Sequence, residues 1–398
     1  MVSTRAKSEA NKTSSYSDRR LAFLTEAQKS WLEKAQRFAD RVSLEDVVQS
    51  DQSNVFRRDL FELACKEGMG SLPFPSTYGG SDGDYLSFVV INEEFARRCV
   101  PIMSSLGVHV LCQEPVFRFG TDEQKSKYLP PSATGKYLAA FGLTEPGAGS
   151  DTAALACTAK KVGNDYILNG TKVFITSGAS SDYFIVMAKL LDPSTSANEK
   201  SITAFIVEQD FPGFKIGQKF DMLGMRGYST CELVFDDCKV PSENLLGAHG
   251  DGRKVALSSL AKGRVTIAAQ CTGWAQGALD AVIRVLGKSH NSPAKNDRYA
   301  AAIGEMAVLI ESARALTYQA AAAIDRGQGD VTLASMAKCQ ASDVAMKVST
   351  DALTLLGIEC SQPDYLLERI FRDAKAGQIY EGANQIQRML IARDLLKS

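Results

Sequence analysis

The sequence is poor in the features that mark several classes of protein. It contains only 3 histidines, and its 9 cysteines form no CxxC pair, so we expect reduced thiols inside a cell and no bound metal. Lys and Arg number 45 against 46 for Asp and Glu, and this balance argues against nucleic acid as the main partner. No apolar run approaches the ~20 residues of a membrane span. A globular protein without a membrane span is expected.

The first twenty residues, MVSTRAKSEANKTSSYSDRR, are polar and basic. They predict a disordered tail over residues 1–20 of a cytoplasmic protein. The alternative is an organelle transit peptide, which would place the protein in the mitochondrial matrix, although Glu9 and Asp18 weigh against it. Hydrophobic residues make up 45% of the 398-residue chain, which is enough for the cores of two or three domains.

Apolar periodicity divides the remainder into three blocks. Residues 21–140 predict helices, and in SFVVINEEFARRC the apolar residues lie on one face and the charges on the other. Residues 141–250 contain the β-rich runs YFIVMAKL, ITAFIVE, FKIGQKF and CELVFDDCKVP. Within them, DYILNGTKVFIT predicts two strands joined by an Asn-Gly turn, and LDPSTSANEKS predicts an exposed loop.

Helices are predicted again over residues 251–398. One buried stripe is expected at Val344, Val348, Ala352, Leu355 and Leu356, which recur at spacings of three and four. The order helices, strands, helices predicts an α+β fold that is mainly α, with a β domain inserted between two helical domains.

Two stretches of the β block have residues suited to a ligand. In FGLTEPGAGSDTAA, the glycines allow close backbone approach, so this stretch could bind a phosphate or a polar ring edge, or form a plain turn. It is not a Rossmann fingerprint, since no strand–GxGxxG–helix unit surrounds it. In KVFITSG, Phe174 and Thr176 are two apart and expected on one face of a strand. They could stack on and hydrogen-bond to a flat heterocycle, or only pack in the sheet.

Specific motifs follow one another in order along the chain: YGGSDGDYLSFVVINEEFAR, RFGTDEQKSKYL, LTEPGAGSD, LNGTKVFITSG, LGMRGYSTCELVFDDCKVP, FRDAKAGQIYEG and IQRMLIARDLLK. Through them the chain shows, over about residues 21–398, a resemblance to the acyl-CoA dehydrogenase family of flavoenzymes. It implies an N-terminal helical domain (21–140), a middle β-barrel or sandwich domain (141–250) and a C-terminal four-helix bundle (251–398), usually in a homotetramer. It also implies FAD, an acyl-CoA substrate and an electron-transfer flavoprotein as acceptor.

The resemblance assigns the catalytic base to Glu381 of the YEG motif. Glu381 would remove the α-proton of the acyl thioester while the β-hydrogen leaves as hydride to the flavin, and desolvation would raise its pKa. In some members the base occupies the position of Gly263. The flavin would be bound by Phe141, Leu143, Thr144, Gly149, Ser150, Phe174, Ile175, Thr176, Ala383 and Gln385. The substrate would be bound by Ser150, Arg264 and Gly382, the glycine allowing close approach.

Two segments depart from the family pattern, both at contacts to a neighbouring subunit's FAD. Segment 284–304 lacks the Arg-x-x-Phe-Gly motif, with Arg284 and Arg298 as candidate substitutes, and segment 357–365 lacks GGxGY. Ala261 stands where an acidic CoA contact is common, so the acyl group could be held by CoA or by a carrier protein. Three hypotheses stay open: an FAD-dependent homotetramer, a heteromer completed by a paralogous partner, and a flavin-free acyl-CoA lyase, isomerase or binding protein.

Overall fold

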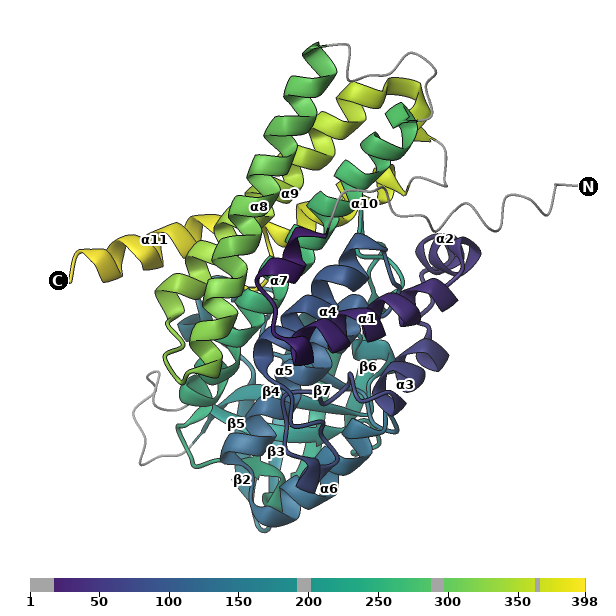
Figure 1. Ribbon diagram of the computed structural model, residues 1–398. Helices are drawn as coiled ribbons and strands as arrows, with labels where there is room; N and C mark the ends of the chain where they lie inside the picture. The colour runs from purple at the N-terminus through teal and green to yellow at the C-terminus, as the bar shows by residue number, and fades with distance from the viewer. Residues whose placement is uncertain (1–17, 192–201, 288–296, 362–365, 398) are drawn as a thin grey trace, which may run out of the picture.

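The computed structural model describes residues 18–191, 202–287, 297–361 and 366–397. It confirms the predicted fold class, because helices precede and follow a single β sheet (Figure 1). Within these residues no helix is both long enough and apolar enough to cross a membrane.

In the described residues before the sheet, six α-helices form the N-terminal block. They are α1 (Glu26–Arg41), α2 (Leu44–Ser53), α3 (Arg58–Lys66), α4 (Tyr85–Arg97), α5 (Met103–Phe119) and α6 (Asp122–Ala133). Three of them begin with a capping box, in which a Ser or Thr side chain and the side chain three residues later satisfy each other's free backbone N–H groups. The starts of α1, α2 and α6 are therefore encoded locally.

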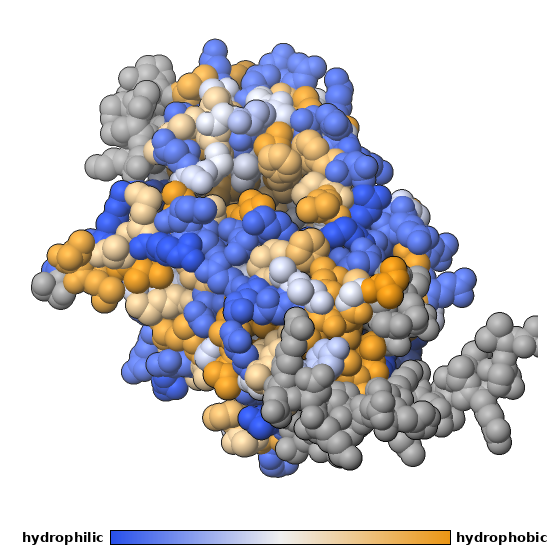
Figure 2. Space-filling model, turned by 90° about the horizontal axis from the view of Figure 1, so that it is seen from above, coloured by the Kyte–Doolittle hydropathy of each residue, from blue (hydrophilic) through white to orange (hydrophobic). Residues whose placement is uncertain are grey.

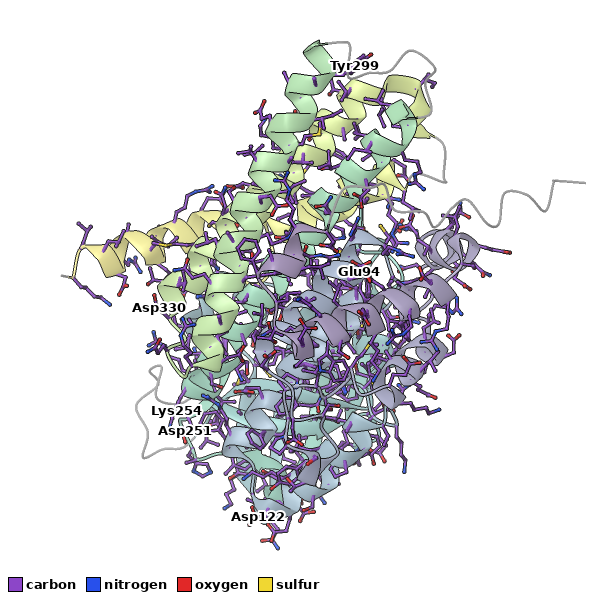
Figure 3. All side chains as sticks on the ribbon, viewed as in Figure 1. Glu94, Asp122, Asp251, Lys254, Tyr299 and Asp330 are labelled. Carbon is purple, nitrogen blue, oxygen red and sulfur yellow. The ribbon has the colours of Figure 1, made fainter. Side chains whose placement is uncertain are left out.

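Helix α4 differs from its predicted two-faced pattern because its charged side is buried as well. Glu93 and Glu94 are 0% and 1% exposed, and Figure 3 places Glu94 in the interior of the helical block. Buried cations compensate them: Arg20 lies 2.8 Å from Glu94, and Arg314 lies 2.9 Å from Glu93. A buried carboxylate stays ionised when it is paired in this way.

The predicted disordered tail, residues 1–20, falls mostly outside the described residues. Its last three residues are described, and Arg20 in the short 3-10 helix Arg19–Ala22 is only 1% exposed. Composition suggested a solvated basic tail, but Arg20 supplies the charge that Glu94 needs. The predicted tail is therefore too long at this end.

Where the structure describes the middle block, eight strands form one sheet in the order β6-β7-β3-β2-β4-β5-β8, with β1 paired to β4. The strands are β1 (Ala139–Gly142), β2 (Thr158–Val162), β3 (Asp165–Ile175), β4 (Tyr183–Leu190), β5 (Ile202–Glu208), β6 (Phe214–Lys219), β7 (Cys231–Pro241) and β8 (Leu245–Leu246). The four quoted β-rich runs form β4 to β7, as predicted. The predicted loop LDPSTSANEKS lies, except for its first residue, outside the described residues.

The hairpin predicted at Asn169-Gly170 is wrong. Strand β3 runs straight through this pair, because its two halves both pair with β7 on either side of a register shift. The Asn169 side chain accepts a 2.9 Å hydrogen bond from the Asp237 backbone N–H, and a Cβ on Gly170 would lie 2.8 Å from Cys157 Cα. The true hairpin turn is Gly163-Asn164, where β2 and β3 meet antiparallel.

Among the residues described after the sheet, the α-helices are α7 (Gly252–Gly287), α8 (Asp297–Asp325), α9 (Val331–Leu356), α10 (Leu367–Gly377) and α11 (Asn384–Leu395). The predicted stripe on α9 is confirmed, with Leu355 half-buried and its four other members buried. Helix α7 packs against α4 and α5 of the N-terminal block and also against α8, α9 and α10. Helix α7 thus connects the N-terminal block with the loop that precedes α11. Helix α11 itself projects from the molecule (Figure 1).

The two segments that depart from the family pattern are described only in part. Residues 288–296 of segment 284–304 and residues 362–365 of segment 357–365 lie outside the described residues. The described start of the second forms a 3-10 helix, Gly357–Ser361, on which Ile358 is 83% exposed.

Candidate active site

Glu381 lies in the turn between α10 and α11, in a left-handed conformation with φ +53°. Its Oε2 atom is buried and has no hydrogen-bond partner in the described part of the chain. Burial raises the pKa of Glu381 to about 7, against the opposing effects of Arg264 and Lys338. A carboxyl group held in this way can accept a proton near neutral pH.

Gly263 on α7 lies directly against this carboxyl group. A Cβ built on Gly263 would lie 2.9 Å from Glu381 Oε2 and 2.6 Å from Leu111 Cδ1. Positions 263 and 381, far apart in sequence, therefore meet at one point in the fold. Any larger residue at 263 would displace the Glu381 carboxyl group or Leu111.

Two buried side chains that the sequence reasoning missed hold the Glu381 turn in place. Lys338 Nζ donates hydrogen bonds to the Gly382 carbonyl at 2.7 Å and to Asn384 Oδ1 at 2.9 Å. Gln387 Nε2 donates to the carbonyls of Glu381 at 2.9 Å and Gly382 at 3.1 Å. The sequence did carry a signal for Lys338: it stands four residues after Ala334 and three before Ala341, a spacing that places a lysine on the buried face of α9.

The reason for glycine at 382 is different from the one expected. Gly382 has φ +92°, which side-chain-bearing residues rarely adopt. A Cβ there would lie 2.3 Å from Gln387 Nε2. The space beside Gly382 is thus taken by the chain's own Gln387, so the glycine serves the turn itself.

Arg264, the predicted CoA contact, is a buried cation beside Glu381. It is 7% exposed, and its Nη1 donates a 3.2 Å hydrogen bond to Ser335 Oγ. Its Nε has no partner among the described residues, and burial lowers its pKa while Glu381 opposes that shift. One donor of the guanidinium therefore stays available.

The first predicted flavin segment follows strand β1. Phe141, Leu143 and Thr144 are half-buried, and Gly149 and Ser150 are exposed. Glu145, which the sequence reasoning passed over, anchors this loop: it is buried, ion-paired to Lys172 at 2.6 Å and hydrogen-bonded to the Cys157 backbone N–H at 3.0 Å. These contacts of Glu145 hold the loop in place, while Gly149 and Ser150 stay exposed on it.

The second predicted flavin segment ends strand β3, and the expectation of a regular strand through it is wrong. Phe174 has φ +58°, and the strand ends at Ile175, so Thr176 lies beyond it. Exposure still alternates: Phe174 is 57% exposed, Ile175 is buried in the sheet core and Thr176 is half-buried. Phe174 stacks on Phe220 with ring centroids 4.8 Å apart.

Hydrogen bonds bring the two flavin segments together and link them to α5. The Val173 N–H donates to the Thr144 carbonyl at 2.8 Å, and the hydroxyls of Ser177 and Ser105 are 2.7 Å apart. Further along α5, Leu111 faces Gly263 and the Glu381 carboxyl group. Ala383 and Gln385 stand apart from these segments in sequence, as the N-cap and an exposed first-turn residue of α11.

Comparison with known proteins gives matches along nearly all of the chain. Family models match for the N-terminal domain of acyl-CoA dehydrogenase over residues 25–136, the middle domain over 140–238 and the C-terminal domain over 250–396. The acyl-CoA dehydrogenase of Bacillus subtilis is 41% identical over 350 residues, which cover 87% of this chain and 92% of that protein.

Two solved structures are similar in both fold and sequence. One is butyryl-CoA dehydrogenase from Megasphaera elsdenii, with a TM-score of 0.89 and 37% identity, covering 94% of this chain and 99% of that one. The other is a chain from the work described as "Electron transferring flavoprotein of Acidaminococcus fermentans: Towards a mechanism of flavin-based electron bifurcation". Its TM-score is 0.91 at 41% identity, with 94% and 99% coverage. The chain therefore belongs to the acyl-CoA dehydrogenase family, whose members are FAD-dependent oxidoreductases.

Proposed function

We propose that this protein dehydrogenates a short acyl thioester at its α and β carbons, with Glu381 as the base that removes the α-proton. The observation that carries the proposal is the Glu381 carboxyl group, which is buried at Oε2, unpartnered there and raised in pKa to about 7. A structural carboxylate would be paired, whereas a base for a weakly acidic carbon needs a dry site.

The residues present fit a flavin. Phe174 offers an exposed ring, and the space where Cβ atoms would lie on Gly147 and Gly149 is open among the described residues, so backbone N–H groups can approach a cofactor. Phe141, Leu143, Thr144, Gly149, Ser150, Phe174, Ile175 and Thr176 would hold the FAD, with Ala383 and Gln385. FAD, when bound, supplies the acceptor for the β-hydrogen as hydride.

The substrate would lie between Arg264 and the Glu381 turn. The free Nε donor of Arg264 and the side chain of Ser150 would bind the thioester moiety. The backbone N–H of Glu381 would donate to the thioester oxygen and stabilise the enolate that forms when the proton leaves. Coenzyme A is the carrier we favour, because the relatives are named for acyl-CoA and butyryl-CoA. The butyryl-CoA dehydrogenase also favours a short acyl group.

Assembly, redox partner and location belong to the same proposal. We expect a homotetramer, because α11 projects from the molecule with Met389, Leu395 and Leu396 between 49% and 84% exposed. Figure 2 shows hydrophobic residues gathered on this projection. An electron-transfer flavoprotein is the expected acceptor, as the similar Acidaminococcus structure suggests. The bacterial relatives favour the cytoplasm over the mitochondrial matrix.

The test is the visible absorption spectrum of the purified protein, alone and after addition of FAD, with its assembly mass measured on the same sample. We expect a flavin spectrum in a homotetramer and bleaching of the flavin on addition of butyryl-CoA. A colourless protein that FAD does not restore would overturn the homomeric dehydrogenase and leave the heteromer or the flavin-free enzyme.

The rate of bleaching should depend on pH through Glu381. Only the ionised carboxylate can accept a proton, so the rate is expected to rise as pH increases through about 7. The buried ammonium of Lys338 lowers the pKa of Glu381. Lys338→Met should therefore move the inflection of the pH profile to higher pH, measured by stopped-flow bleaching at a series of pH values.

Lys347→Met is the matched control, because Lys347 lies on the same helix but is 47% exposed and pairs with Asp351. Its pH profile should not move. If Lys338→Met lowers the rate equally at all pH values, Lys338 only supports the turn and its charge does not set the pKa of the base.

A further inference from the structure

A small cavity of about 10 Å³ lies against the Glu381 site. Gly263, whose missing side chain leaves room for the Glu381 carboxyl group, lines it on α7, and Leu111 lines it on α5. Such a volume is about that of one water position. The cavity borders the site where Glu381 would remove the α-proton. The end of the acyl group distal to the thioester would therefore lie in this cavity.

The lining of the cavity includes several polar side chains, which is unexpected for a pocket that holds a hydrocarbon tail. Glu114 is 4% exposed, and its two oxygens pair with Lys262 at 2.8 Å and Arg118 at 2.7 Å. The Tyr85 hydroxyl donates to the Lys262 carbonyl at 2.6 Å and lies 2.6 Å from Thr266 Oγ1. These charged and polar groups are therefore already partnered.

Ser259 is the exception. It is 0% exposed, lines the cavity, and its Oγ has no hydrogen-bond partner in the described part of the chain. It stands one helical turn before Gly263, about 6 Å along the axis of α7. A buried hydroxyl without a partner carries an uncompensated desolvation cost, so a ligand that supplies a partner binds more tightly than one that does not.

We propose that the cavity is a subsite for the distal hydroxyl of a short acyl thioester, with Ser259 as the residue that binds it. The inference rests on the proposed function and names its substrate class. A distal carboxylate would face Glu114, and a distal ammonium would face Lys262 and find Glu114 already paired. A neutral group that can both donate and accept a hydrogen bond fits the unpartnered Ser259 hydroxyl.

The test compares pairs of thioesters that differ by hydroxyl against methyl at the distal position: 4-hydroxybutyryl-CoA against pentanoyl-CoA, and 5-hydroxypentanoyl-CoA against hexanoyl-CoA. Their dissociation constants are measured by calorimetry on the FAD-loaded Glu381→Gln protein, which binds without turnover. The hydroxylated member of one pair should bind more tightly, and Ser259→Ala in the same background should reduce that preference about tenfold.

Ser258→Ala is the matched control, because the neighbouring Ser258 hydroxyl is satisfied by the Val255 carbonyl at 2.7 Å. It should leave the preference unchanged. No preference in either pair, or a preference that Ser259→Ala leaves intact, overturns the subsite. Butyryl-CoA is measured alongside: if it does not bind either, the proposed function fails, whereas binding of butyryl-CoA without a hydroxyl preference defeats only this inference.

Discussion

Replacing Glu381 with Gln should reduce the rate of flavin bleaching by butyryl-CoA between about 10²- and 10⁴-fold, the range that general-base catalysis contributes. Gln is close in size to Glu, so Gly263 and Leu111 can keep their contacts, but an amide cannot take the α-proton. The turn should keep its shape, because Lys338 and Gln387 bind its backbone carbonyls and not the carboxyl group. Single-turnover mixing of FAD-loaded protein with butyryl-CoA measures the effect.

Glu305→Gln provides the control. Glu305 lies on α8, is 62% exposed and pairs only loosely with Lys347 at 3.4 Å, so its rate should equal that of the unmodified protein. A Glu381→Gln protein that bleaches within tenfold of the normal rate would show that another group removes the proton.

Replacing Arg314 with Met should lower the free energy of unfolding by about 3–5 kcal/mol, the usual cost of leaving a buried charge without its partner. Arg314 and Glu93 are 4% and 0% exposed and 2.9 Å apart. Arg314 also donates to Gln276 Oε1 at 2.8 Å, a contact that Met cannot replace. Tyr318 still donates to Glu93 at 2.8 Å, but a hydroxyl does not neutralise the charge. Arg20 Nη1 lies 3.8 Å from Glu93, and this cation already pairs with Glu94 at 2.8 Å, so it compensates Glu93 only in part. Denaturant-induced unfolding followed by circular dichroism measures the loss.

Two further variants separate charge from packing. Arg37→Met removes a pair with Glu33 in which both side chains are about two-thirds exposed, and it should change stability by less than about 0.5 kcal/mol. Glu93→Gln added to Arg314→Met removes the unpaired charge and should restore part of the stability. If the double variant is less stable than Arg314→Met, lost packing and not the stranded carboxylate explains the effect.

Much of the fold was predictable because its local signals are strong. Strands β4 to β7 correspond to uninterrupted β-rich runs, and the stripe on α9 has clean helical spacing. The Asn169-Gly170 error had a different origin. The pair has the composition of a tight turn, yet the close approach of Cys157 leaves room only for a glycine at 170, and pairing across the sheet cannot be seen from one segment of sequence.

Residues of the candidate active site were predictable from the sequence only where they belong to a family motif, as Glu381 does. Glu381 came from the resemblance, but the contacts that shape it join residues far apart in sequence, as between Lys338 and Gly382. The same holds for the charges of α4, whose partner Arg314 lies more than two hundred positions away. Spacing along the chain shows which residues share a helix face, but not which distant side chain meets them.

The buried ion pair between Glu145 and Lys172 has a consequence for the affinity of the cofactor site. It fixes the loop after β1 to strand β3 during folding, so the conformational entropy of ordering that loop is lost before any ligand arrives. A preorganised surface binds without that additional cost, so its affinity reflects contacts more than rearrangement. The apoprotein should thus resemble the loaded protein in this region.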